Sequence, residues 1–427
     1  MKRFAWLLLV LGCDDGSSAA QTQLTFVARH VQTLGFGAAD NSEVIKLLPA
    51  GDKAVLVASK GRKVTLLGIT ADGMTELQSV SLFADDGGES ELTHIDFDSA
   101  GKFAAITHTL PVVQDGAVVD CQGELVFVDV QPGATFGQVL NRVPVGPYPD
   151  AVDLNENSTF AVTADEVDFN DGKCPVASVV GSVTAIELPN GDPTQARVRA
   201  RIIMDETADG GRREPEQIRF GFDDDRVAVT LQDTHEVLFF RLSDLLAGAG
   251  EEVVERPVAD FTVTRYPNRD DGAEPWPDGV TRMRDANGAE WFVASGEYND
   301  TFAFFTPDGA FEHQVAITAA DVPSDFPRNI ESWSLAPFRP DSVAAFTQGG
   351  RHYLAFSLKH AGAVGIWQAE TPAEAHVAAV VKIGLTEMGT PTTESTVGPE
   401  GISAAEGIIV TANEKESSAS LVRTELR

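Results

Sequence analysis

An acidic residue stands shortly before an apolar residue at six places where the chain begins a predicted β-strand. These acids are Glu43, Asp150, Glu216, Asp278, Glu331 and Glu400. Four of the six directly follow a proline. Because the pattern returns at a spacing of roughly 50 to 65 residues, it predicts a radially repeated fold that places one chemical group many times around one axis.

Each of these starts is followed by short strand patterns that alternate with tight turns. In the unit that begins at Glu216, residues 216–220, 226–230 and 236–240 are predicted strands, and residues 261–263 form a fourth. The units from Asp150 and Glu400 repeat this order, but the chain ends one strand short of a complete last sheet. Residues 23–28 precede the first unit and can supply the missing outer strand.

The sequence therefore predicts an all-β protein. The expected architecture is a seven-bladed β-propeller of four-stranded antiparallel blades, with the ring closed by the N-terminal strand. The count of seven includes a unit that starts at Thr93, where the others carry an acid. A row of β-sandwiches is the rival architecture, but it does not explain a single strand left over at both ends.

The N-terminus has the features of an export signal. Lys2 and Arg3 precede a short apolar run, which ends at Gly12-Cys13. The run is too short for a permanent membrane helix, which needs about 20 residues. A small residue before a single cysteine resembles the lipobox of bacterial lipoproteins, in which the cysteine, here Cys13, is acylated. An ordinary secretory signal with an incidental cysteine is the alternative.

These features divide the chain into three parts. We expect a lipoprotein-type signal peptide at residues 1–12, a flexible tether at residues 13–22 and the propeller domain at residues 23–427. The protein is then exported and attached to the bacterial cell membrane through lipid only, in the periplasm or at the cell surface.

Two further cysteines, Cys121 and Cys174, lie in predicted adjacent blades. In an exported chain, two cysteines are more often bridged than free. Each lies shortly before a predicted strand, so equivalent strands would bring their loops to one face. We therefore expect a Cys121–Cys174 disulfide, with two unpaired thiols as the alternative.

The chain is strongly acidic, with a formal net charge of −32. A field of this sign repels phosphates and so excludes nucleic acid as a partner. Cations, basic surfaces and a salty habitat are compatible with it, and simple solubility is the plain alternative.

Several short motifs resemble a known family. They lie at residues 43–45, 214–216, 229–233, 398–402 and 410–414. They are similar to the choice-of-anchor I domain, which belongs with the YVTN and WD40-like seven-bladed propellers of exported bacterial proteins. The resemblance spans most of residues 23–427, implies no established reaction and is compatible with a lipid anchor.

The repeated acids are the candidate binding residues. The inner strand of each propeller blade lines the central channel, so acids at the strand starts are expected to converge at one channel mouth. Loops after the second strands carry further acids, at Glu166, Glu297 and Glu414 among others, and open on the same face. Crowded carboxylates bind a cation or take up protons, and oxygen ligands favour Ca²⁺. The alternative is that these acids only form turns at strand starts.

The sequence lacks the usual catalytic motifs. It has no Gly-x-Ser-x-Gly elbow, His-Glu-x-x-His pair or phosphate-binding loop, so we predict no catalytic residues and favour a role other than catalysis. The expected function is a monomeric binding or scaffold module of the cell envelope, for a protein, a glycan or a small ligand. The alternative is a Ca²⁺-dependent hydrolase of the phytase or lactonase kind, although its channel bases are dispersed. These bases are Arg213, Arg269, Arg282 and Lys359.

Overall fold

The computed structural model describes residues 25–38, 40–83, 90–167, 173–207, 210–248, 250, 252–329, 336–385 and 393–427. The predicted signal peptide, the tether and Cys13 lie outside these ranges. Within them, no helix is both long enough and apolar enough to cross a membrane.

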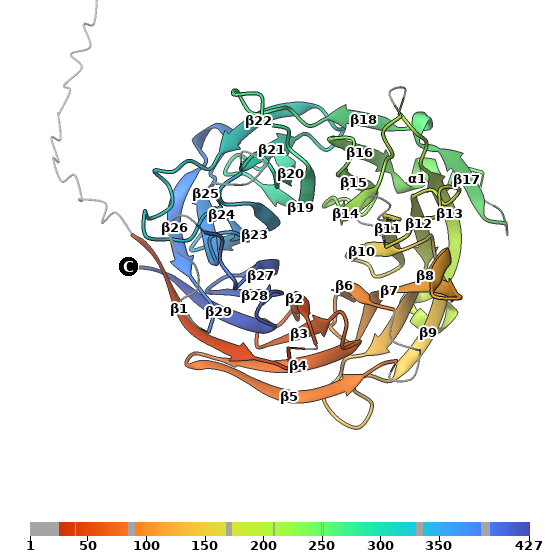
Figure 1. Ribbon diagram of the computed structural model, residues 1–427, viewed down its shortest axis with the longest axis horizontal. Coiled ribbons are helices and arrows are strands. Elements are labelled where there is room, and N and C mark those ends of the chain that lie inside the picture. The colour runs from red at the N-terminus through yellow and green to blue at the C-terminus, as the bar shows by residue number, and fades with distance from the viewer. Residues whose placement is uncertain are drawn as a thin grey trace, which may run out of the picture.

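The described residues form seven sheets that surround a central channel as the blades of a propeller (Figure 1). The first blade contains β2 (Ser42–Leu47), β3 (Lys53–Ala58), β4 (Lys63–Thr70) and β5 (Gly73–Ser81). The second contains β6 (Leu92–Phe97), β7 (Phe103–Gln114), β8 (Ala117–Asp129) and β9 (Val139–Pro144). The third contains β10 (Pro149–Leu154), β11 (Phe160–Asp165), β12 (Ser182–Glu187), β13 (Arg197–Ile203) and an added parallel strand, β17 (Val254–Pro257).

The remaining four blades have four strands each. The fourth contains β14 (Pro215–Phe220), β15 (Arg226–Leu231), β16 (Glu236–Arg241) and β18 (Thr262–Arg265). The fifth contains β19 (Pro277–Arg284), β20 (Glu290–Gly296), β21 (Thr301–Phe305) and β22 (Phe311–Ala316). The sixth contains β23 (Pro340–Gln348), β24 (Arg351–Leu358), β25 (Ala363–Gln368) and β26 (His376–Lys382). The seventh contains β27 (Pro399–Ala405), β28 (Ile408–Asn413), β29 (Ser418–Leu426) and β1 (Phe26–Gly35).

Helical segments of the described chain are short connectors. They are α1 (Leu242–Leu245) and the 3₁₀ turns η1 (Pro189–Gly191), η2 (Pro193–Gln195), η3 (Val258–Asp260) and η4 (Pro372–Glu374). The all-β prediction is confirmed.

The N-terminal strand closes the ring, as predicted. In the antiparallel pair of β1 and β29, Phe26 lies opposite Leu426 and Gly35 lies opposite Ser418. The backbone N–H of Thr25 also donates to the carbonyl of Arg427 at 2.8 Å. The two ends of the described chain therefore hold one blade together.

Apolar side chains fill the spaces between neighbouring blades. Val183 of the third blade shares a core cluster with Val229 of the fourth, and Leu56 of the first shares one with Val410 of the seventh. Central strands such as β3 are buried on both faces, because each blade packs between two others. A fully buried valine or leucine contributes about 1.5 to 3 kcal/mol, so this ring of cores makes the channel a rigid frame.

The two cysteines form the predicted disulfide. Sγ of Cys121 and Sγ of Cys174 are 2.02 Å apart, and the bond joins the second blade to the third. Cys121 lies within β8 and not before it, because β7 and β8 form a hairpin longer than those of the other blades. The disulfide packs against Val167, which follows β11 closely.

The predicted start of the sixth blade is wrong. Glu331 lies outside the described residues, and the inner strand of that blade is β23, which begins at Pro340. The acid in the equivalent position is therefore Asp341. Its Pro340-Asp341 step has the same form as the steps at Asp150 and Asp278.

Candidate functional site

Each inner strand contains a register shift at its start. In β2 the shift falls between Ser42 and Val44, and so leaves Glu43 outside the regular ladder. The same irregularity occurs near Asp150 in β10 and near Glu400 in β27. A bulge re-aims the side chain of the extra residue and is common at the rims of closed sheets. The repeated acids thus occupy bulges at the channel mouth.

A repeated hydrogen bond fixes a second residue beside each bulge. In every described blade, a residue of the second strand or directly after it donates its backbone N–H to a carbonyl at the start of the inner strand. The acceptor is the residue two positions before the bulge residue, at 2.9 to 3.2 Å. The donors are Ser59, Thr109, Glu166, Gln232, Glu297, Lys359 and Glu414. We call these residues the loop positions. Each blade therefore holds one strand-start residue and one loop position next to each other.

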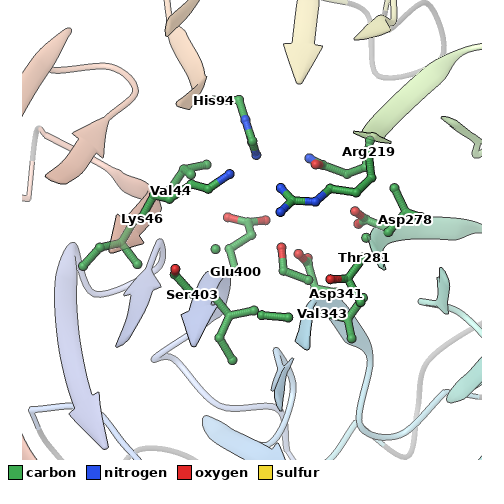
Figure 2. Close-up of a pocket in the computed structure, with 18 of the residues that line it drawn as sticks. Val44, Lys46, His94, Arg219, Asp278, Thr281, Asp341, Val343, Glu400 and Ser403 are labelled. Atoms are coloured by element: carbon green, nitrogen blue, oxygen red, sulfur yellow. The ribbon is translucent and has the colours of Figure 1, made fainter. Parts of the chain in front are cut away.

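The strand-start acids line one cavity of about 210 Å³. Figure 2 shows Asp278, Asp341 and Glu400 directed into it from three blades. The acids that line the cavity are Glu43, Asp150, Glu216, Asp278, Asp341 and Glu400. Five of the six residues named from the sequence therefore converge, and Asp341 takes the place given to Glu331.

Among the residues that the structure describes, two groups of three carboxylates have oxygen atoms close enough together to bind one metal ion. One consists of Asp150, Glu166 and Glu216, and the other of Asp278, Glu297 and Asp341. In each group, one oxygen atom per residue lies within 4.8 Å of the others. Each group combines two strand-start acids with one loop-position acid, so the blade repeat itself produces the grouping.

Burial and mutual repulsion favour the protonated forms of Glu43, Glu216 and Asp278. Burial raises the pKa of Glu43 to about 8, and Asp150 contributes to the shift. Burial also raises the pKa of Glu216 well above its usual range, and Glu166 and Asp150 raise it further. The pKa of Asp278 is raised in the same way, by burial and then by Asp341. Without a cation, the mouth must hold protons at neutral pH.

Basic residues of the described chain offset part of this charge. Lys173 lowers the pKa of Glu43, and Lys359 and Arg339 form ion pairs with acids of the mouth. The Nζ of Lys359 contacts the carboxylate of Glu400 and lies 3.5 Å from Oδ2 of Asp341. The Nε of Arg339 lies 2.5 Å from Oε1 of Glu297. Burial alone lowers the pKa of Lys359, but Glu400 and Asp341 raise it well above its usual value.

A second tier of charged residues lies one step further down the channel. The Nζ of Lys46 is 2.6 Å from Oδ1 of Asp96, and Nη1 of Arg219 is 2.7 Å from Oδ1 of Asp153. In Figure 2, Lys46, Arg219 and His94 surround the cavity. Burial and the charge of Lys46 lower the pKa of His94 to about 3, so His94 is neutral at pH 7. In these two pairs the numbers of basic and acidic residues are equal, whereas acids outnumber bases at the mouth.

The fold and this mouth define the protein as a seven-bladed β-propeller with a carboxylate-lined channel. The choice-of-anchor I domain family matches residues 43–313. The chain belongs to this family, as its motifs suggested. No curated protein matches the chain.

Solved structures with the same fold come from proteins with different roles. The chain is similar to virginiamycin B lyase from Staphylococcus aureus, with 14% identity, a TM-score of 0.53 and coverage of 93% of this chain and 99% of the other. It is also similar to the β-propeller domain of Cps50 (Swd1) from Myceliophteria thermophila, with 10% identity, a TM-score of 0.55 and coverage of 93% and 99%. Hydrazine synthase of Kuenenia stuttgartiensis gives 12% identity, a TM-score of 0.57 and coverage of 90% and 96%. At these identities the likeness concerns the fold alone.

Proposed function

We propose that the protein is a binding module of the bacterial cell envelope whose channel mouth takes a positively charged ligand. The observation that carries this proposal is the convergence of six strand-start carboxylates on one cavity. The basic residues paired with carboxylates at this mouth, Lys359 and Arg339, offset only part of the negative charge. A ligand that supplies positive charge relieves the repulsion, and the packed blades hold the acids in place for it.

Two observations of different kinds support the proposed envelope location. The chain belongs to the choice-of-anchor I domain family, and a Gly12-Cys13 step ends an apolar run behind Lys2 and Arg3. We propose export and attachment through lipid on Cys13. The lipid then keeps the binding module at the membrane, and the channel mouth binds the positively charged ligand there.

The geometry favours binding over hydrolysis of phosphate esters. A phosphate substrate needs basic groups that are free to contact it, but the bases named from the sequence are all paired with carboxylates. Besides Lys359, the other three bases form the ion pairs Arg213–Glu236, Arg269–Asp271 and Arg282–Glu156, with N–O distances of 2.6 to 2.9 Å. The lyase activity of one structural neighbour does not transfer, because that likeness concerns the fold alone.

The proposal is tested by thermal unfolding with a panel of cationic ligands at constant ionic strength. The panel comprises CaCl₂, MgCl₂, spermidine and a lysine-rich peptide, with NaCl as the reference. We expect at least one member to raise the melting temperature of the wild type more than NaCl does, because it binds only the folded state. The double variant Glu216→Gln/Glu400→Gln is expected to lose most of this extra shift.

The matched control is Glu76→Gln/Glu312→Gln, which removes the same charge from exposed positions on the outer strands β5 and β22. This control is expected to keep the wild-type response. If every member of the panel acts like NaCl, or if both double variants respond alike, the channel mouth is not the binding site.

A further inference from the structure

We infer that the channel mouth holds one Ca²⁺ ion, bound between Asp150, Glu166 and Glu216. This inference rests on the proposed function, since it names the positively charged ligand that one part of the mouth takes. Two of the three proposed ligands, Asp150 and Glu216, belong to the predicted ring of six acids. The third, Glu166, is a loop-position residue outside that ring.

The three carboxylates come from two neighbouring blades. Asp150 starts β10 and Glu216 starts β14, whereas Glu166 directly follows β11. One oxygen atom of each residue lies within 4.8 Å of the other two. Because Ca²⁺–oxygen distances are about 2.3 to 2.6 Å, oxygens around one ion lie no more than about 5 Å apart. The spacing therefore fits a single ion that touches all three residues.

One carboxylate oxygen of Glu216 is a candidate ligand atom for a cation. This atom, Oε2, is shielded from solvent and accepts no hydrogen bond from a donor group of the described residues, and the carboxyl beside it is that of another acid, Glu166. A buried carboxylate oxygen without a donor is costly, and a cation at this place satisfies it. Glu166 is held in position by its backbone N–H, which donates to the carbonyl of Tyr148 at 3.1 Å. That contact links Glu166 to the turn that carries Asp150.

The other group of three carboxylates already contains positive charge from the chain. Arg339 pairs with Glu297, and Lys359 lies 3.5 Å from Asp341. A cation there must displace or repel these bases. Around Glu216, by contrast, the charges with the largest effect on its carboxyl are those of Glu166, Asp150 and Glu297, which are all acids. The ion is therefore assigned to the group at Asp150, Glu166 and Glu216.

The ligand set favours calcium among the common divalent cations. The three side chains offer carboxylate oxygens, which suit Ca²⁺ and Mg²⁺, whereas Zn²⁺ more often takes histidine and cysteine. Ca²⁺ accepts six to eight ligands in flexible geometry, so water in the cavity can complete its shell. Mg²⁺ demands near-ideal octahedral geometry at shorter distances, which fits acids spread over two blades less well.

The test is isothermal titration of the EDTA-treated and dialysed protein with CaCl₂. We expect one Ca²⁺ per chain in the wild type and weaker binding, by at least about tenfold, in Glu166→Gln and in Glu216→Gln, because each variant removes one charged ligand. The matched control is Glu76→Gln at an exposed position on β5, which removes the same charge and is expected to bind Ca²⁺ within about threefold of the wild type. Asp278→Asn, in the other group, is measured beside it and is expected to weaken binding less than Glu216→Gln does. Circular dichroism and melting temperature identify any variant that does not fold, so each site residue is tested by its own substitution.

The outcomes separate this inference from the proposed function. If the wild type takes up no Ca²⁺ while spermidine or the lysine-rich peptide still binds, the calcium assignment is wrong and the cation-binding mouth stands. If Asp278→Asn weakens binding as much as Glu216→Gln does, the ion lies elsewhere in the ring. If no cation of any kind binds, both proposals fail.

Discussion

The ammonium group of Lys359 contacts the carboxylate of Glu400, and this ion pair joins the sixth blade to the seventh across the channel mouth. Lys359 occupies the loop position that Glu166 and Glu297 occupy in the third and fifth blades. In the sixth blade the chain itself supplies positive charge to the ring. The ring is therefore asymmetric, and the proposed cation site lies away from Lys359.

This relationship predicts the effect of Lys359→Gln. The substitution leaves Glu400 and Asp341 buried near each other without their counter-ion, so we expect the free energy of unfolding to fall by about 3 kcal/mol. Urea unfolding at pH 7.5 in the presence of EDTA measures the change. The control is Lys53→Gln, which breaks a surface pair with Asp52 of 2.7 Å and is expected to cost less than about 1 kcal/mol. Equal losses in the two variants contradict a structural role for Lys359 at the mouth.

Local sequence patterns predicted much of the fold but not every strand start. Proline followed by an acid correctly marked β10, β14, β19 and β27, because the turn, the bulge and the first strand lie within a few residues. Glu331-Ser332-Trp333 has the same acid and apolar spacing as a true strand start and so predicts one, whereas the sixth blade begins at Pro340-Asp341. Only pairing with β24 distinguishes the two positions, and that pairing depends on distant residues.

The second tier of the channel was missed for a geometric reason. Lys46 lies three residues after Glu43, and Arg219 lies three residues after Glu216. In a regular strand, residues three apart point to opposite faces. The bulge at each strand start adds one residue, so both members of each pair line the same cavity. The sequence contains both residues but does not indicate the bulge.

The disulfide predicts a loss of stability in the variant Cys121→Ala/Cys174→Ala. The bond closes a loop with a sequence separation of 53 and joins two blades, so its removal is expected to cost about 2 to 4 kcal/mol. Urea unfolding without reductant compares the variant with the wild type. Reduced and alkylated wild-type protein is expected to show a similar loss. Intact-mass analysis that finds both thiols free in the untreated protein contradicts the bond.

The proposed lipid anchor predicts the fate of Cys13→Ser. Without an acylated cysteine, the protein is expected to move from the membrane fraction to the soluble fraction of the envelope. Fractionation and immunoblotting of cells that express each form measure this shift. The control is Cys121→Ala/Cys174→Ala, which removes two cysteines but is expected to stay with the membrane. Unchanged fractionation of Cys13→Ser rules out this anchor.

The raised pKa values of the mouth predict a pH dependence of stability in the absence of divalent cations. The pKa of Glu43 is about 8 in the folded protein, against an ordinary value of 4.5, so the folded state holds a proton that the unfolded state has lost. Stability therefore falls as pH rises from 4.5 through about 8, by up to about 1.4 kcal/mol per pH unit for each such proton. Histidines with lowered pKa values, such as His94, also make stability depend on pH. For these groups stability rises with pH, but only below about pH 6.5, where the unfolded state takes up their protons.

The informative window is therefore pH 6.5 to 8, in which the carboxyls act without the histidines. Melting temperatures measured with EDTA are expected to fall across this window, and Glu43→Gln is expected to flatten the fall because its amide does not titrate. The control Glu76→Gln, at an exposed position, is expected to keep the wild-type slope. Saturating Ca²⁺ is expected to reduce the slope as well, since a bound cation stabilises the ionised carboxylates that protons otherwise neutralise. A melting temperature that rises from pH 6.5 to 8 contradicts the protonated state of the mouth.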